Sequence, residues 1–485
     1  MKKIYSSLLV FLLSIALSGC GSNVSNTDDL TLKIYNWQDY IDDGTDEDGE
    51  KVSNSIMDDF EEWYYDEYNV KVTVEYDTFE TNEVMLNNIK TGKTDYDLAC
   101  PSEYVIQKMI NYDMLEELDL DAVDPNGNEI FTNYHYLSEY LMNLFSAKGW
   151  DKYAIPYMWG TMGFLYNIEN VGLENINSWN ILWDTDLKFT VKDSMRDTYI
   201  VGALYVYQEE LLDLSSKYEK GVIGVTEYSD GVSEIINRSD SASLEMIQQA
   251  LIDLKDNSFG FEVDSGKNDI LTGKIDINFA WSGDAVYSMD VAEEESGEEL
   301  GYVVPDEGSN IWFDGWVMPK GANVSLAESF LNYLCNPEIA SRNMSFIGYT
   351  TAITGDDVWN LVNDWYSDDE GEYVVDLSYL FLGNLSPEYL TDGKALIRVS
   401  SQDRQFDTQY PSEDVIARCG IMEDFGDNND AVIEMWQNVK IGNISIWVTF
   451  AVLILIFSFF GVFYGTKIYK KYTKKKRNKR VKAQY

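Results

Sequence analysis

The feature that most constrains the fold is an alternation of strand-like and helix-like patterns over residues 30–110. Apolar and polar residues alternate at Leu30, Leu32 and Ile34, as in a strand with one buried face. Helical and strand spacing then take turns in the segments 56–64, 70–76, 85–89, 96–100 and 101–110. Since parallel strands are joined by crossover helices, the pattern predicts an α/β fold with a parallel sheet.

A second α/β region is predicted beyond an apolar, glycine-containing stretch at 153–167, which suits a chain that crosses between two lobes. The chain has 485 residues, of which 45% are hydrophobic, and this is enough for two cores. Further strands are expected at 189–191, 275–279 and 311–318, and a helix at 244–254. The predicted first lobe comprises 30–158 and 314–355, and the predicted second lobe comprises 159–313 and 356–440.

The N-terminus has the organisation of a secretory signal. Residues 1–19 have a basic start, a short apolar core and small residues before Cys20. The sequence LSGC at 17–20 resembles a bacterial lipobox, which implies cleavage before Cys20, lipidation of that cysteine and a tether at 20–29. An uncleaved anchor is the alternative.

The C-terminus predicts a second attachment. Residues 444–464 carry no charge and are long enough to span a bilayer. The tail at 465–485 is basic, so the positive-inside rule places it in the cytoplasm. The chain between the two anchors is therefore expected on the extracytoplasmic face of the cell membrane.

The charge of the chain favours a cationic ligand. The formal net charge is −47, although residues 467–482 contribute ten Lys and Arg and no acid. A field of this sign repels nucleic acid and accelerates encounter with cations. We expect no nucleic-acid partner.

Signatures of catalysis, cofactors and metals are absent from the sequence. There is no P-loop, no GxGxxG and no HExxH, and the chain has a single histidine. Cys100, Cys335 and Cys419 form no close pair, which excludes a CxxC zinc motif and leaves any single disulfide undetermined. The acidic loops at 42–50 and 121–129 lack the spacing of calcium loops. We expect no metal and no cofactor.

Aromatic residues and carboxylates recur where predicted strands end. Trp37, Asp39 and Tyr40 follow the first strand, and Ser102 and Tyr104 follow a later one. Ligands of parallel sheets bind beyond the carboxyl ends of the strands. An aromatic face attracts a cation by about 0.5–2 kcal/mol. These positions predict a wall for a small cationic ligand; the alternative is a set of core aromatics with a capping aspartate.

Five separated motifs carry a family resemblance. They are YNWQDY at 35–40, DLACPSEY at 97–104, IPYMWG at 155–160, WSG at 281–283 and WFD at 312–314. Their order resembles that of the spermidine/putrescine-binding proteins of bacterial ABC importers, over residues 30–439. The resemblance implies a two-lobed periplasmic-binding-protein fold of type II, with the ligand between the lobes and closure about a hinge.

The resemblance also implies ten ligand-binding residues: Trp37, Asp39, Tyr40, Ser102, Tyr104, Asp197, Trp281, Trp312, Asp314 and Tyr349. The family usually has two acids three residues apart at one helix start. Here Ser194 and Asp197 stand at those positions, and Asp197 is shorter than the usual glutamate. This departure bears on the choice between spermidine and putrescine.

The sequence thus predicts an extracytoplasmic polyamine receptor that delivers spermidine or putrescine to an ABC permease and performs no chemistry. Two alternatives remain open. One is a receptor of the same fold for another cationic or metal-containing solute. The other is a membrane-anchored hydrolase that uses a pair of carboxylates.

Overall fold

The computed structural model of the chain describes residues 30–442, apart from 47–48, 125, 173–175, 264 and 401–402, together with residues 458 and 464. The predicted secretory signal, Cys20, its tether, the basic tail and all but two residues of the predicted membrane segment lie outside the described part. No helix of the described part is long and apolar enough to cross a membrane.

The alternating patterns at the start of the chain form a parallel sheet, as predicted. Strand β1 (Leu30–Trp37) pairs in parallel with β2 (Val72–Phe79) along its whole length. The short β3 (Leu98–Ala99) pairs in parallel with the other edge of β1. The helices beside these strands are α1 (Ile56–Tyr68), α2 (Asn82–Lys90) and α3 (Glu103–Asn111).

Helix α1 begins where the sequence supplies a capping box. The Ser55 side chain accepts a hydrogen bond from the backbone N–H of Asp58, whose carboxylate accepts one from the N–H of Ser55. Ile56, Phe60 and Tyr64 are the buried residues of the helix. Their spacing puts them on one stripe, which packs into the core.

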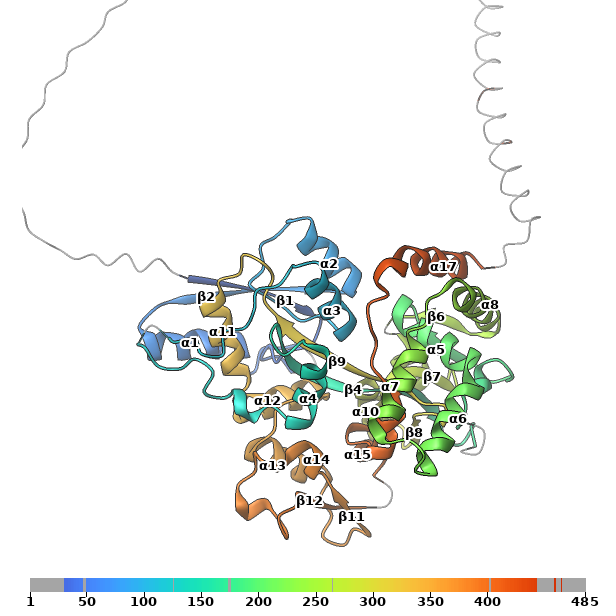
Figure 1. Cartoon of the computed structure of the whole chain (residues 1–485). Coiled ribbons are helices and arrows are strands. Elements are labelled where there is room, and N and C mark those ends of the chain that lie inside the picture. The colour runs from blue at the N-terminus through green and yellow to red at the C-terminus, as the bar shows by residue number, and fades with distance from the viewer. Residues whose placement is uncertain are drawn as a thin grey trace, which may run out of the picture.

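Two long strands connect the two ends of the sheet. Strand β4 (Ala154–Asn167) pairs in antiparallel fashion with β9 (Ser309–Val317), with a register shift between Pro156 and Met158. Farther along, β4 pairs with β7 (Ile277–Trp281). The strand order is β2-β1-β3-β9-β4-β7-β5-β6, so β4 and β9 lie at its centre (Figure 1). We call the β2-β1-β3 end with its helices the first lobe and the β7-β5-β6 end the second lobe.

The second lobe repeats the parallel arrangement. Strand β5 (Phe189–Lys192) pairs in parallel with β7 on one side and with β6 (Gly260–Glu262) on the other. Strand β8 (Leu300–Val303) pairs with β4. The helices of this lobe are α5 (Met195–Val206), α6 (Gln208–Glu219), α7 (Val225–Ile236), α8 (Ser241–Asn257), α9 (Ser265–Leu271) and α10 (Ser282–Glu295).

The region after β9 returns to the first lobe. It contains α11 (Val324–Leu334), α12 (Pro337–Ile347), β10 (Thr350–Thr351), α13 (Asp356–Tyr366), β11 (Tyr373–Asp376), α14 (Ser378–Phe381) and β12 (Leu396–Val399). Helix α13 packs against α12, and α14 packs against α4 (Glu139–Lys148) (Figure 1). The Ser138 hydroxyl donates a 2.9 Å hydrogen bond to the Leu380 carbonyl. The sequence analysis assigns 356–440 to the second lobe; on these contacts we propose instead that 356–399 belongs with the first lobe.

The chain rejoins the second lobe only near its described end. Helix α15 (Arg404–Gln409) packs against α10, and α17 (Asn429–Ile441) packs against α8. The segment between them passes between the lobes (Figure 1). There Lys108 of α3 lies 3.5 Å from the Asp424 carboxylate, and Arg196 of α5 donates to the carbonyl of Glu423. This segment therefore contacts both lobes.

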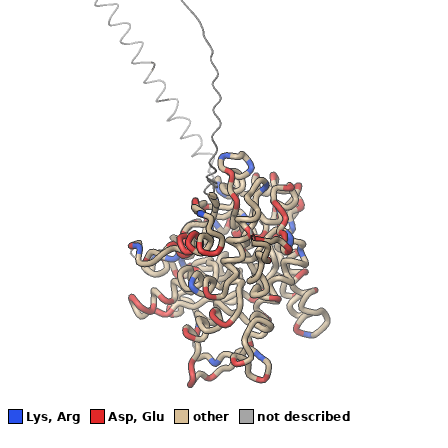
Figure 2. Tube along the Cα trace, turned by 90° about the vertical axis from the view of Figure 1, so that its left-hand side faces the viewer, with Lys and Arg blue, Asp and Glu red and all other residues tan. Residues whose placement is uncertain are grey.

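Acidic residues are spread over the whole molecule. Figure 2 shows Asp and Glu in loops and helices all around the described trace, with fewer Lys and Arg among them. The negative field is therefore a property of the whole surface and not of one patch, so it favours cations generally.

Candidate ligand-binding site

Asp314 is the centre of a polar network that joins the central strand β9 to two segments of the first lobe. It lies in β9 and is buried, with 8% of the residue's surface exposed. Its Oδ1 accepts a 2.7 Å hydrogen bond from the Ser102 hydroxyl, and its Oδ2 accepts a 2.9 Å bond from the Tyr40 hydroxyl. Tyr40 follows β1 and Ser102 caps α3. The fold thus brings together three residues that the sequence singled out.

Burial makes the Asp314 carboxylate unusual. Desolvation raises the pKa of Asp314 to about 6, and the negative charge of Asp197 adds to the rise. The hydrogen bonds from Ser102 and Tyr40 oppose this rise, because they stabilise the ionised form. A cation placed beside this carboxylate would lower its pKa again, so the group is suited to bind one.

Asn82 is a residue of this network that the sequence interpretation missed. Its Nδ2 lies 3.0 Å from both the Ser102 hydroxyl and the Tyr104 hydroxyl, and its Oδ1 accepts a bond from the Ser102 N–H. Asn82 opens α2 directly after β2. Its position beyond the carboxyl end of a parallel strand is the signal that could have found it.

Tyr349 links the first lobe to the second. Its ring lies edge-on to Tyr40 at 5.5 Å between centroids and 5.6 Å from the ring of Trp312. Its hydroxyl donates a 2.7 Å hydrogen bond to Asp284 Oδ1, at the start of α10. Trp312 is fixed in turn, because its indole N–H donates to the Thr161 carbonyl. The predicted residues Tyr40, Trp312 and Tyr349 therefore form one aromatic cluster.

Asp197 contributes a second buried carboxylate. It lies in the first turn of α5, and desolvation by burial raises its pKa to about 6. Lys192 and Arg196 oppose the rise and Glu83 adds to it. Ser194, which stands where the family usually has another acid, is the N-cap of α5 and accepts a bond from the N–H of Asp197. The serine thus has a structural role in starting the helix.

Trp281 lies beside a lysine that the sequence interpretation did not single out. The Lys192 ammonium lies 4.3 Å from the centroid of the Trp281 ring. It is also 3.4 Å from Glu262 Oε1 and 3.5 Å from Asp284 Oδ2. The signal for Lys192 is its place at the carboxyl end of a predicted strand, and the signal for Asp284 is its place shortly after Trp281, in the first turn of α10.

Asp39 and Trp37, two of the ten predicted residues, take no part in the contacts described above. Asp39 is exposed and adopts a left-handed conformation with φ of 52°, and its carboxylate accepts a 3.4 Å hydrogen bond from the side chain of Gln38. Trp37 is half-buried, and its ring packs against Phe79 with 4.5 Å between centroids. A turn places successive side chains in different directions, so the spacing of Trp37, Asp39 and Tyr40 does not put all three on one wall.

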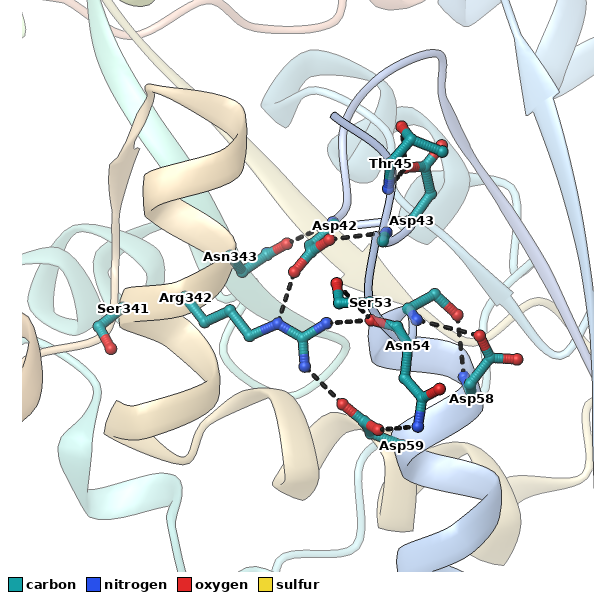
Figure 3. A network of polar contacts seen from close by, with 12 residues as sticks. Asp42, Asp43, Thr45, Ser53, Asn54, Asp58, Asp59, Ser341, Arg342 and Asn343 are labelled. Atoms are coloured by element: carbon teal, nitrogen blue, oxygen red, sulfur yellow. Dashed lines mark hydrogen bonds and ion pairs between the residues drawn. The ribbon is translucent and has the colours of Figure 1, made fainter. Parts of the chain in front are cut away.

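The loop after Tyr40 is held by helix α12 (Figure 3). Arg342 donates to the Asp42 carboxylate and to the Asp59 carboxylate, each at 2.5 Å. The neighbouring Asn343 accepts a bond from the Asp42 N–H and donates to the Tyr157 hydroxyl. Tyr157 then donates a 2.7 Å bond to the Tyr40 carbonyl. These contacts fix the backbone of Tyr40 and hence its bond to the central carboxylate.

Other chemistry is not supported by the described residues. In this part of the chain no group of three or more His, Cys, Asp or Glu side chains is arranged to hold a metal ion. Cys100, Cys335 and Cys419 are free and buried. The site therefore offers carboxylates, hydroxyls and aromatic faces as its means of recognition.

Comparisons with known proteins all point to solute-binding proteins. The model of the bacterial extracellular solute-binding protein family (SBP_bac_8) matches residues 55–370. A spermidine/putrescine-binding periplasmic protein of Salmonella typhimurium is 28% identical over 345 residues, which cover 70% of this chain and 81% of that protein. A putrescine-binding periplasmic protein of Escherichia coli is 27% identical over 326 residues, which cover 66% of this chain and 78% of that protein.

Solved structures agree with this. A putative spermidine/putrescine ABC transporter protein from Listeria monocytogenes is 25% identical and aligns with a TM-score of 0.58 over 84% of this chain and 98% of that one. The substrate-binding protein of a spermidine/putrescine ABC transporter from Streptococcus pneumoniae is 26% identical. It aligns with a TM-score of 0.54 over 85% of this chain and 99% of that one. The predicted α/β periplasmic-binding-protein fold is thereby confirmed.

Proposed function

The chain belongs to the bacterial extracellular solute-binding protein family, and on this basis we propose that it is a polyamine receptor of an ABC importer. Members of the family are extracytoplasmic binding receptors and not enzymes, which removes the hydrolase alternative. Several relatives are described as spermidine/putrescine-binding or putrescine-binding proteins. The identity of the ligand is our proposal.

The buried carboxylate of Asp314 carries the proposal. It receives hydrogen bonds from Ser102 and Tyr40 but forms no ion pair with any Lys or Arg of the described chain. Asp197 is likewise buried and without an ion pair among the described residues. Buried carboxylates gain most from a cation, and a charge-assisted hydrogen bond to an ammonium contributes about 1.5–3 kcal/mol.

The surroundings of these carboxylates suit the rest of a polyamine. A polyamine alternates ammonium groups with methylene runs, which pack against flat aromatic faces. Tyr40, Trp312 and Tyr349 provide such faces next to Asp314. Two or three charge-assisted bonds with aromatic contacts, reduced by the entropy of binding, correspond to a dissociation constant in the micromolar range or tighter.

We propose that binding closes the two lobes about the central strands. Tyr40 belongs to the first lobe, and Asp314 lies in the central strand β9, where it accepts hydrogen bonds from Tyr40 and Ser102 of that lobe. Asp197 belongs to the second lobe. A ligand that pairs with carboxylates of both lobes binds the closed form better and shifts the population towards it. The ten residues of the predicted site keep this role in the proposal, with Asp39 at its exposed edge.

The cellular setting is also proposed. Lipidation at Cys20 and a single membrane span at 444–464 would hold the receptor at the extracytoplasmic face of the membrane, with the basic tail in the cytoplasm. Attachment at both ends would keep the receptor close to the ABC permease that receives the ligand, and so raise its effective concentration there.

Titration calorimetry tests the proposal. The full-length chain in a mild detergent is titrated with putrescine, with spermidine and, as a matched neutral compound, with 1,4-butanediol. We expect saturable binding of at least one amine and no binding of the diol. Absence of binding for both amines contradicts the polyamine assignment.

A further inference from the structure

Lys192 is a buried lysine that the proposed recognition of a polyamine does not use. It is the last residue of β5 and is 1% exposed. Its ammonium lies over the ring of Trp281, at 4.3 Å from the centroid, and within 3.5 Å of carboxylate oxygens of Glu262 and Asp284. An aromatic face flanked by two carboxylates is the environment that an ammonium group of a ligand would seek.

This environment lies on the ligand side of the sheet. Glu262, Lys192 and Trp281 are the last residues of β6, β5 and β7, which are neighbouring parallel strands. Ligands bind beyond the carboxyl ends of such strands. Asp284 connects the position to the rest of the site, because it accepts the hydrogen bond from Tyr349, whose ring contacts Tyr40.

The charges divide into two groups. Lys192 pairs with Glu262 and Asp284, and Lys267 also lies 3.4 Å from Asp284. Asp314 and Asp197 form no ion pair with any Lys or Arg in the part of the chain that the structure describes. Two carboxylates therefore remain to be matched by ligand charges.

Glu103 is a third buried carboxyl group, and its environment disfavours the charged form. It is fully buried, and its Oε2 accepts a 3.1 Å hydrogen bond from the Phe313 N–H. Desolvation raises the pKa of Glu103 well above its ordinary value, with Asp314 and Asp197 adding to the rise. Burial of this carboxyl group thus favours its neutral form over the charged one.

Given the proposed polyamine receptor, we infer that Lys192 acts as a built-in ammonium that occupies the cation position beside Trp281, so that the site selects a diamine over a triamine. A diamine brings two ammonium groups for Asp314 and Asp197. The third ammonium of a triamine would lie close to the Lys192 ammonium, which already covers a face of Trp281. Like charges in a buried site repel strongly.

The test compares two lysines that contact the same aspartate. Putrescine and spermidine are titrated into the full-length chain and into its Lys192→Met and Lys267→Met variants. Lys267 is the matched control, because its side chain is 25% exposed and its ammonium lies over Tyr287 instead of Trp281. A third variant combines Lys192→Met with Glu262→Gln. It removes one charge of each sign, so that Glu262 is not left as a buried charge without its partner. Thermal melting verifies that each variant is folded.

We expect the wild-type chain to bind putrescine at least tenfold more tightly than spermidine. Lys192→Met, or the double variant, should improve spermidine binding relative to putrescine by at least tenfold, and Lys267→Met should change that ratio by less than threefold. Tighter binding of spermidine to the wild-type chain, or an unchanged ratio in the folded Lys192 variants, overturns the inference and leaves the receptor intact. Absence of binding for both amines instead contradicts the receptor itself.

Discussion

The hydroxyl of Tyr40 donates a 2.9 Å hydrogen bond to the carboxylate of Asp314, which lies 274 positions later in the chain. Tyr40 follows the first strand of the sheet, and Asp314 lies in one of its two central strands. Both side chains are buried. This pair therefore ties the edge of the proposed ligand site to the strands that connect the lobes.

Asp314→Asn should weaken putrescine binding by at least tenfold. The amide keeps the shape of the carboxylate and loses its charge, so a bound ammonium is left without its counterion in a buried place. Calorimetry on the full-length variant measures the effect. Asp357→Asn is the control, because Asp357 is an exposed residue of α13 and is not among the proposed site residues. Equal affinities of wild type and Asp314→Asn would remove Asp314 from the site.

Affinity for an amine should fall as the pH is lowered from 8 to 5. Burial raises the pKa of both Asp314 and Asp197 to about 6, so protons compete with the ligand in this range, while the amine stays protonated throughout. The loss should approach tenfold per pH unit for each carboxylate below pH 6. Titrations at four pH values measure it. A constant affinity over this range is the contrary result.

The same shifts have a consequence for stability with the opposite sign. The pKa of Asp314 and of Asp197 is higher in the folded, ligand-free protein than in the unfolded chain, so folding favours their protonated forms. Their contribution to the free energy of unfolding should therefore decrease as the pH rises from about 4 to 7. Removing both groups with Asp→Asn substitutions should flatten this part of the stability profile, as measured by denaturation of the ligand-free chain. An unchanged slope would mean that neither pKa is raised.

Arg342→Met should lower the free energy of unfolding by about 1–3 kcal/mol, between the values for exposed and buried ion pairs. The change removes half-buried contacts to Asp42 and Asp59. Denaturant unfolding measures it. Lys51→Met is the control, since its pair with Asp58 is exposed and should contribute less than about 1 kcal/mol. Equal losses in both variants would show that Arg342 does not hold the loop.

Gly283→Ala should weaken amine binding at least tenfold by displacing Tyr349. A Cβ at Gly283 would lie 2.0 Å from the nearest atom of the Tyr349 ring, far inside any allowed contact. Gly224→Ala is the control, because a Cβ there meets nothing within 4 Å. Calorimetry and thermal melting distinguish a loss of binding from a loss of folding. Unchanged binding in Gly283→Ala would exclude a role for Tyr349 in its present position.

The parts of the fold that could be predicted from the sequence are those with a clear periodicity of apolar residues. The strands at 30–34 and 70–76 and the helix at 56–64 have strong patterns of period 2 or 3.6, and the structure has β1, β2 and α1 there. The placement of 356–399 could not be read in this way. Its proposed position depends on the packing of α14 against α4, which is distant in sequence, and composition does not reveal such a contact.

The same distinction applies to the candidate site. Strand ends identified Tyr40 and Ser102, because the carboxyl ends of parallel strands converge. Asp314 lies inside β9 and was identified by the family resemblance. The environment of Lys192 depends on Glu262 and Asp284, which lie on other elements, and no local spacing encodes such ion pairs. The exposed position of Asp39 follows from a left-handed turn, which the residue type permits but does not require.

A crystal structure of the chain with putrescine tests the central claim most directly. The account predicts one ammonium nitrogen within hydrogen-bond distance of the Asp314 carboxylate, the other near Asp197, and the methylene chain against Tyr40, Trp312 and Tyr349. Putrescine bound away from Asp314, or no putrescine between the lobes at saturating concentration, would contradict it.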